Sequence, residues 1–85
     1  MTSKVNSTTF TLYTKDGCIY CEKAKAYITY DLFDSFEEIK LDKIKDSKEY
    51  DNLLQTTGHR TFPFVFYNGE FIGGYNELKA NTRFQ

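Results

Sequence analysis

Apolar and polar residues alternate near the start of the chain and then recur at helical spacing. The segment Thr9–Tyr13 places Phe10 and Leu12 on one side, which predicts a short strand. From Cys18–Tyr30 the apolar positions follow the period of a helix, and Phe36–Leu41 again predicts a strand. Two strands joined by a helix form a parallel pair with a right-handed crossover, so this half of the chain predicts a βαβ unit.

The second half of the chain predicts a helix, a hairpin and a final helix. A helix that begins at Asp46 or Ser47 ends at Gly58, because glycine is a common C-terminal stop. The run Phe62–Tyr67 is apolar on both faces, which is typical of a central strand. The remaining elements are a turn at Asn68–Gly69, a strand over Glu70–Ile72 and a helix over Tyr75–Asn81. The order βαβαββα predicts an α/β fold with one mixed four-stranded sheet and helices on both faces.

Length limits the protein to one small domain. A domain usually takes roughly 100–200 residues, and this chain has 85. We therefore expect a single domain over 1–85 with a polar, disordered start over 1–8. Eight phenylalanines and seven tyrosines are enough to fill a compact core, and the length excludes a two-domain enzyme.

Charge and hydropathy narrow the expected partners. Eleven basic and twelve acidic residues give a net charge of -1, whereas nucleic-acid binders usually carry a strongly basic face. No apolar run approaches the length of a membrane span, and Met1–Thr9 lacks the apolar stretch of a secretory signal. We expect a cytoplasmic protein that binds neither nucleic acid nor membranes.

Cys18 and Cys21 are the candidate catalytic residues. Two intervening residues at the start of a helix put the sulfurs within one turn, close enough for a small disulfide loop. Cys18 precedes the free N–H groups of the first turn, and Lys15 adds positive charge, so we expect the pKa of the Cys18 thiol to fall below about 8.5. Cys21 lies one turn in and suits a resolving thiol. The alternatives are a chance pair or a zinc site, although zinc needs four ligands and only His59 remains as a further candidate.

Two other features have both structural and functional interpretations. Pro63 is the only proline and falls in the predicted central strand, where it costs a ladder hydrogen bond. The residues alone predict the commoner trans bond after Phe62, while a cis bond would turn the Phe62 backbone toward an extended peptide. Gly73–Gly74 is either a simple turn or a close-approach site where the N–H groups of Tyr75 and Asn76 hold a carboxylate.

Several polar residues have a simpler structural interpretation. His59 is predicted to be a solvated loop residue rather than a base, and its place beside Arg60 leaves a minor electrostatic role open. Glu37 and Glu38, together with the lysines that follow them, are predicted to form a solvated face.

Three segments in this order resemble the glutaredoxin family, within the thioredoxin-like fold. They are Tyr13–Cys21 (YTKDGCIYC), Gly58–Pro63 (GHRTFP) and Ile72–Leu78 (IGGYNEL), and the match runs roughly over Thr9–Leu78. The resemblance implies that Cys18 is the nucleophile, that Cys21 resolves the mixed disulfide, and that a glutathione site lies beside them.

The resemblance also implies which residues of this sequence bind each part of glutathione. Lys15 would pair with the glycine carboxylate, and the backbone of Phe62, ahead of a cis Pro63, would pair with the cysteine. Gly74 and the two residues after it would hold the γ-glutamyl end, and Arg60 would help to bind a carboxylate. The implied glutathione-binding residues are Lys15, Tyr20, Arg60, Thr61, Phe62, Pro63, Gly73, Gly74, Tyr75 and Asn76.

The sequence departs from the family pattern at three positions. Ile19 replaces the usual proline of the dithiol motif, which changes the first helical turn. Phe62 stands at the usual valine position. Asn76 stands where aspartate is common, which removes a charge that would pair with the ammonium of glutathione. The hypothesis is that this protein binds glutathione more weakly than family members that have the aspartate.

The implied activity is glutathione-dependent reduction of protein disulfides and protein–glutathione mixed disulfides by a monomer. Glutathione is then the co-substrate, no cofactor is tightly bound, and ribonucleotide reductase is a substrate suggested by the family alone. One alternative is a dimeric carrier of a glutathione-ligated [2Fe–2S] cluster, although those relatives usually have one active-site cysteine. Another alternative is a thioredoxin-like reductant fed by a reductase.

Overall fold

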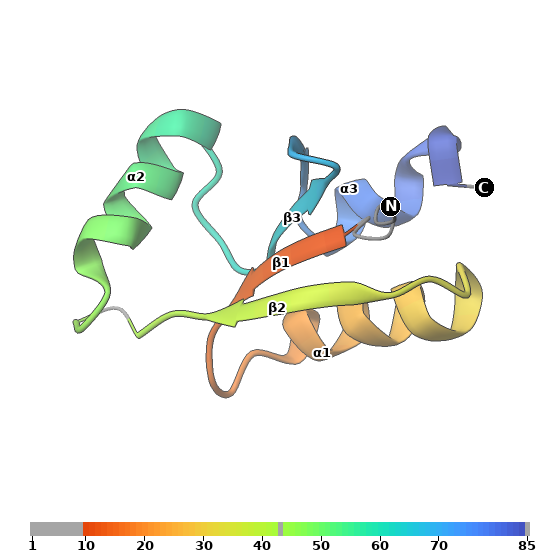
Figure 1. Ribbon diagram of the computed structural model, residues 1–85, viewed down its shortest axis with the longest axis horizontal. Coiled ribbons are helices and arrows are strands. Elements are labelled where there is room, and N and C mark those ends of the chain that lie inside the picture. The colour runs from red at the N-terminus through yellow and green to blue at the C-terminus, as the bar shows by residue number, and fades with distance from the viewer. Residues whose placement is uncertain (1–9, 43, 85) are drawn as a thin grey trace, which may run out of the picture.

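A four-stranded sheet in the order β2-β1-β3-β4 forms the centre of the protein (Figure 1). The computed structural model describes residues 10–42 and 44–84, so the predicted start over 1–8 lies outside the described residues. The strands are β1 (Phe10–Thr14), β2 (Phe36–Lys40), β3 (Phe64–Tyr67) and β4 (Glu70–Gly73). The helices are α1 (Ile19–Ala26), α2 (Ser47–Thr57) and α3 (Tyr75–Ala80), with a wide π turn over Tyr27–Asp31 and a short 3-10 turn over Thr82–Phe84.

The strand pairing confirms the predicted mixed sheet. Strand β1 runs parallel to β2, with Phe10 opposite Phe36. On its other side β1 runs antiparallel to β3, with Leu12 opposite Val65. The β3–β4 hairpin turns through Asn68–Gly69, and both residues have positive φ, 51° and 86°, as a tight hairpin turn requires.

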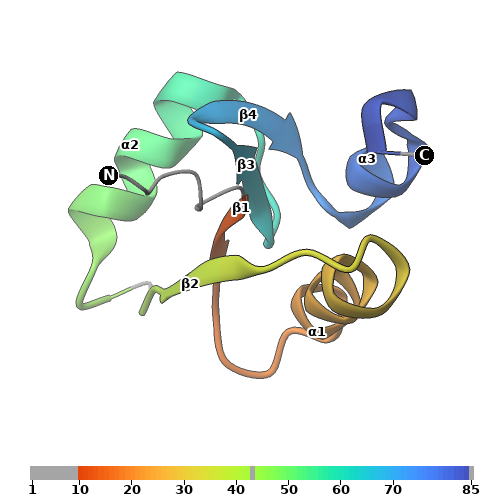
Figure 2. The same cartoon turned by 45° about the vertical axis from the view of Figure 1, so that its right-hand side comes forward.

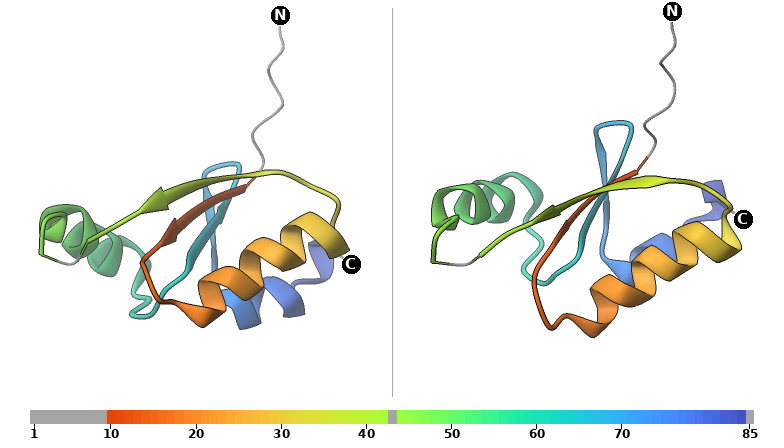
Figure 3. Two further views of the ribbon diagram at one scale, coloured as in Figure 1. Left: turned by 90° about the horizontal axis from the view of Figure 1, so that it is seen from below. Right: turned by 60° about the horizontal axis from the view of Figure 1, so that its bottom comes forward.

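Helices cover both faces of the sheet. Helices α1 and α3 lie side by side on one face and α2 lies on the other (Figures 2 and 3). The first face buries a cluster of apolar residues, Phe10, Leu12, Ala24, Ile28, Val65 and Leu78. The second face buries Cys21, Leu41, Leu53, Phe62 and Phe64. Cys21 therefore belongs to the core on the α2 side, although it lies on α1, and this links the cysteine motif to the segment that precedes β3.

Two element boundaries differ from the sequence-based expectation. The strand predicted over Phe62–Tyr67 is wrong at its start, because β3 begins at Phe64 and Pro63 lies just outside the ladder. The Phe62–Pro63 bond is cis, as the family resemblance implied and as the residues alone did not. The helix predicted to Tyr30 is regular only to Ala26 and continues as a π turn.

Helix α2 begins and ends as predicted. Asp46 is its N-cap, and the chain leaves the helix at Gly58, whose φ of 72° is left-handed. The Gly58 N–H donates to the Leu54 carbonyl at 2.9 Å, which satisfies one of the last carbonyls of the helix. Within the described part of the chain, no helix has both the length and the apolar character needed to cross a membrane.

Candidate functional site

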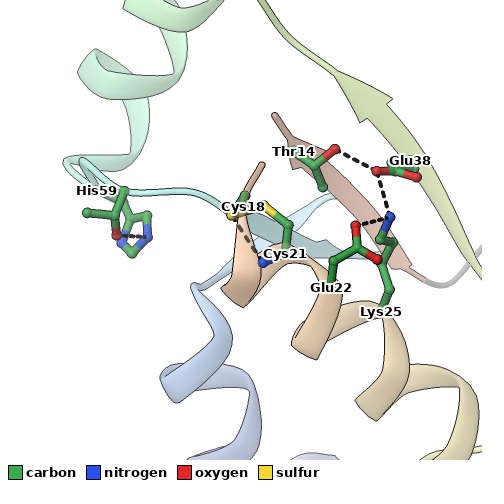
Figure 4. Close-up of a disulfide and its surroundings, with 8 residues drawn as sticks. Thr14, Cys18, Cys21, Glu22, Lys25, Glu38 and His59 are labelled. Carbon is green, nitrogen blue, oxygen red and sulfur yellow. Dashed lines mark hydrogen bonds and ion pairs between the residues drawn. A yellow bond between two sulfur atoms is a disulfide. The ribbon is translucent and has the colours of Figure 1, made fainter. Parts of the chain in front are cut away.

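The two cysteines lie at the start of α1 and are joined by a disulfide (Figure 4). Cys18 is the N-cap in an extended conformation, and its sulfur accepts the backbone N–H of Cys21 at 3.1 Å. The two Cα atoms are 5.2 Å apart. Cys18 is half-buried, whereas Cys21 is only 1% exposed. Of the two sulfurs, therefore, the one at Cys18 is open to attack by another molecule.

A pocket of about 340 Å³ surrounds the exposed sulfur. Its walls come from the β1–α1 loop, the first turn of α1, helix α2 and the segment before the cis proline. They are Lys15, Gly17, Cys18, Ile19, Tyr20, Tyr50, Arg60, Thr61 and Phe62. Two cations, Lys15 and Arg60, therefore lie in the same pocket as Cys18.

The Phe62 ring forms part of one wall of this pocket and contacts two other residues that line it. The ring stacks on Tyr50 with centroids 5.5 Å apart and planes 11° apart. The Lys15 amine lies 5.7 Å from the centre of the Phe62 ring, within the range of a cation–π contact. Phe62 itself is 7% exposed. Its ring thus holds the Lys15 amine beside the pocket.

A second pocket of about 280 Å³ adjoins the first. Its walls come from the first turn of α1, the segment before β3 and the start of α3. They are Tyr20, His59, Thr61, Phe62, Pro63, Gly74, Tyr75, Asn76 and Glu77. Because Tyr20, Thr61 and Phe62 line both pockets, the two pockets form one groove that passes Cys18. We call it the Lys15–Asn76 groove.

The groove brings together most of the predicted site residues. Ten of them line it, namely Lys15, Cys18, Tyr20, Arg60, Thr61, Phe62, Pro63, Gly74, Tyr75 and Asn76. Cys21 lies beneath the surface. Gly73 ends β4 behind the groove with a φ of 133°.

Sequence reasoning missed several residues of the groove, of which His59 is the most informative. His59 lies in a loop, as predicted, but it is half-buried rather than solvated, because its ring packs on Phe64 and Phe71 with centroids 5.2 and 5.5 Å away. Its sequence signal is weak, since it rests only on its place within the Gly58–Pro63 motif. Glu77 and Tyr50 also line the groove and were missed. Glu77 lies within the Ile72–Leu78 motif, whereas Tyr50 lies on the apolar face of α2, where a core position is the ordinary expectation.

A cluster of polar side chains joins α1 to strands β1 and β2 (Figure 4). Glu38 on β2 accepts the Thr14 hydroxyl at 2.7 Å and the Lys25 amine at 3.1 Å. Lys25 also pairs with Glu22 at 2.9 Å. The Thr14 hydrogen bond, followed by the Lys25 contacts, lowers the pKa of the Glu38 carboxyl, and the hydrogen bond to Glu22 raises the pKa of Lys25. The prediction that Glu38 belongs to a solvated face is wrong, because this carboxylate joins β1, β2 and α1.

The described residues contain no group of three or more histidine, cysteine, aspartate or glutamate side chains arranged to hold a metal ion. The cysteine pair is instead arranged for thiol–disulfide chemistry: one sulfur is accessible, the other is within bonding reach, and a backbone N–H points at the accessible sulfur. The protein has a mixed four-stranded sheet with helices on both faces, and its cysteine pair lies at the start of α1. These features define the thioredoxin-like fold.

The comparisons with known proteins define the family. The glutaredoxin family model matches residues 10–72, and the chain belongs to the glutaredoxin family. Glutaredoxin 3 of Escherichia coli (strain K12) is 33% identical over 69 residues, which cover 81% of this chain and 80% of that protein. The mitochondrial glutaredoxin-2 of Mus musculus is 38% identical over 64 residues, or 74% of this chain. This chain matches only 40% of the length of that mouse relative.

Solved structures agree with this assignment. The buckwheat glutaredoxin–glutathione complex superposes with a TM-score of 0.78 at 34% identity, over 92% of this chain and 71% of that one. Glutaredoxin 1 from Francisella tularensis gives a TM-score of 0.73 at 35% identity, over 87% of this chain and 91% of that one. The fold predicted from the sequence is therefore confirmed at the level of the family.

Proposed function

We propose that the protein is a glutathione-dependent thiol–disulfide oxidoreductase that acts through Cys18 and Cys21. The Lys15–Asn76 groove is the observation that carries the proposal, because it passes the accessible sulfur and holds all but Gly73 of the residues that the family resemblance assigns to glutathione. A structural relative from buckwheat is a complex with glutathione. We propose that glutathione lies along this groove with its cysteine beside Cys18.

The ends of the groove fit the two ends of glutathione. Lys15 and Arg60 supply positive charge in the pocket that contains Cys18, which suits the glycine carboxylate. Gly74 and Asn76 line the second pocket, at the end proposed for the γ-glutamyl group. A tripeptide extends over roughly 10 Å, so it can bridge two adjoining pockets. Phe62 and Thr61 lie in both pockets and would contact the middle of the ligand.

The first half-reaction removes glutathione from a mixed disulfide. The Cys18 thiolate attacks the sulfur of the bound glutathione moiety, and the Cys18–glutathione disulfide forms as the old S–S bond breaks. The protein substrate leaves as a thiolate and takes up a proton. A second glutathione thiolate then attacks the glutathione sulfur held by Cys18, which restores the Cys18 thiolate and releases glutathione disulfide.

Protein disulfides need the second cysteine. Cys18 attacks one sulfur of the substrate, and Cys21 then attacks the sulfur of Cys18, which releases the reduced substrate and leaves the Cys18–Cys21 disulfide. A Cys18–Cys21 disulfide, as found in the structure, is the state that this attack would leave, which supports the proposal. Two glutathione molecules return the pair to the dithiol form. We propose that the protein does this as a monomer in the cytoplasm, with glutathione as its only co-substrate.

A comparison of electron donors tests the proposal. The purified protein is supplied either with glutathione and glutathione reductase or with thioredoxin reductase, and the reduction of a glutathionylated peptide is followed through NADPH oxidation. We expect turnover with the glutathione system and none with thioredoxin reductase. The reverse result would identify a reductase-fed, thioredoxin-like protein. A brown dimer without reductase activity would identify an iron–sulfur carrier.

A further inference from the structure

His59 occupies a fixed position that the chemistry proposed above does not use. Helix α2 ends ahead of Gly58, and the His59 N–H donates to the Thr57 hydroxyl oxygen at 3.0 Å. The imidazole packs edge-on to Phe64, with an interplanar angle of 80°, and is tilted by 60° against Phe71. Packing on two rings and one backbone hydrogen bond hold the imidazole in one place.

The imidazole forms part of the wall of the second pocket. A Cβ atom added to Gly74 would lie 3.1 Å from the His59 Nε2 atom, so the ring edge reaches the backbone at the start of α3. The same nitrogen lies 3.3 Å from the Thr61 hydroxyl oxygen. Asn76 lines the same pocket. The Nε2 atom of His59 therefore lies at the end of the groove proposed for the γ-glutamyl group.

The charged and titratable groups around His59 come from several elements. Glu77 on α3 accepts the Gly74 N–H at 2.8 Å, and its Oε1 atom would lie 3.3 Å from the same added Cβ. Strands β3 and β4 present aromatic rings to the imidazole. The other titratable or charged neighbours are Tyr20, Tyr75 and Arg60. His59 is the one histidine among the residues that line this pocket, and histidine is the side-chain type whose charge ordinarily changes between pH 5 and 8.

We propose that protonated His59 binds the α-carboxylate of the γ-glutamyl group, so that the affinity for glutathione increases as the pH falls. The inference rests on the proposed function, since it assumes that glutathione lies in the groove. Glutathione has a carboxylate at each end, and the groove then offers a cation to both, Lys15 with Arg60 at one end and His59 at the other. A hydrogen bond from a charged donor is roughly twice as strong as a neutral one. The protonated imidazole should therefore bind the carboxylate more tightly than the neutral imidazole does.

The test is a binding measurement that needs no turnover. Both cysteines are replaced by serine so that no protein thiol titrates, and S-methylglutathione binding is measured by calorimetry at about pH 5.5 and 7.5, on either side of the usual histidine range. We expect about tenfold tighter binding at the lower pH, and no such difference after His59→Gln. Glu77→Gln separates this effect from that of the carboxylate beside Gly74: whatever its own affinity for S-methylglutathione, the pH dependence should persist in it.

A second ligand identifies the group that His59 recognises. The S-methyl derivative of γ-aminobutyryl-cysteinylglycine keeps the ammonium of glutathione but lacks the α-carboxylate. We expect its affinity to be independent of pH and of the His59→Gln substitution. A pH dependence that survives His59→Gln, or an equal loss of affinity at both pH values, would overturn the inference and leave His59 with a packing role. If S-methylglutathione binds at neither pH, the proposed function itself is wrong.

Discussion

The Lys15 amine lies 5.7 Å from the centre of the Phe62 ring, and the two residues share the pocket that surrounds Cys18. The Phe62 ring also stacks on Tyr50, since the two rings lie nearly parallel. The family's usual valine at this position offers neither interaction. Phe62 therefore adds a local means of positioning Lys15, the residue proposed for the glycine carboxylate of glutathione.

Replacing Phe62 with leucine should expose this role. The Phe62→Leu variant loses the stacking on Tyr50 and the contact with Lys15, so we expect the free energy of unfolding to fall by about 1–2 kcal/mol. Urea unfolding followed by circular dichroism measures this difference. Phe33→Leu is the matched control, because the Phe33 side chain is 88% exposed and the same substitution should cost less than about 0.5 kcal/mol there. Equal effects at both positions would contradict the interpretation.

The unequal exposure of the two sulfurs predicts different phenotypes for the cysteine variants. Cys18→Ser should abolish reduction of both kinds of substrate, because Cys18 carries the accessible sulfur. Cys21→Ser should retain deglutathionylation, since that reaction is completed by a second glutathione, and should lose most reduction of protein disulfides. Initial rates with a glutathionylated peptide and with a disulfide substrate give the comparison. Full activity in Cys18→Ser would refute the assignment of the nucleophile.

The fold was predictable because its signals are local. The alternation around Phe10 and Leu12, the positive-φ pair Asn68–Gly69 and the stop at Gly58 each act over a few residues, and the structure shows each of them in the predicted role. The start of β3 was not predictable from the same signals. An apolar run continues through Pro63, whereas in the structure the chain still bends at Thr61 and Phe62 and the ladder begins only at Phe64.

The site residues could be predicted only within the three segments that resemble the family. His59 and Gly74 lie 15 positions apart in the sequence and meet because the β3–β4 hairpin returns the chain to the end of α2. The Thr14–Glu38–Lys25 cluster likewise joins three elements. A histidine in a loop or a glutamate in an edge strand has the composition of a solvated surface, and its partners become visible only when the long-range packing is known.

Gly73 and Gly74 should tolerate an added methyl group to different degrees. At Gly73 the φ is 133° and the added Cβ would lie 2.6 Å from the Glu77 Cβ, so Gly73→Ala combines backbone strain with an overlap. At Gly74 the φ is −100° and the added Cβ would meet the edge of His59 at 3.1 Å. We expect Gly73→Ala to lose roughly 2 kcal/mol more stability than Gly74→Ala in urea unfolding. Equal losses would contradict the backbone argument.

Asn76→Asp should tighten the binding of glutathione. Asn76 lines the second pocket, and an aspartate there would face the ammonium of the γ-glutamyl group with a full negative charge. We expect the Kd for S-methylglutathione to fall by about three- to tenfold at pH 7.5. Asn52→Asp on α2 adds the same charge outside the groove and serves as the control. An affinity that stays the same or decreases in Asn76→Asp would count against the proposed position of the γ-glutamyl group.

Glu38→Gln should remove a pH-dependent part of the stability. The pKa of the Glu38 carboxyl is lowered from its ordinary 4.5, chiefly by the Thr14 hydroxyl and then by Lys25. A carboxyl with a lowered pKa in the folded state contributes stability that is present above about pH 4.5 and is lost as the pH falls through the folded value. The wild-type protein should therefore exceed Glu38→Gln by roughly 1–2 kcal/mol at pH 6, and the difference should shrink toward pH 3. Urea unfolding over this range measures it, with the exposed Glu37→Gln as control, and a constant difference between pH 6 and pH 3 would contradict the assignment.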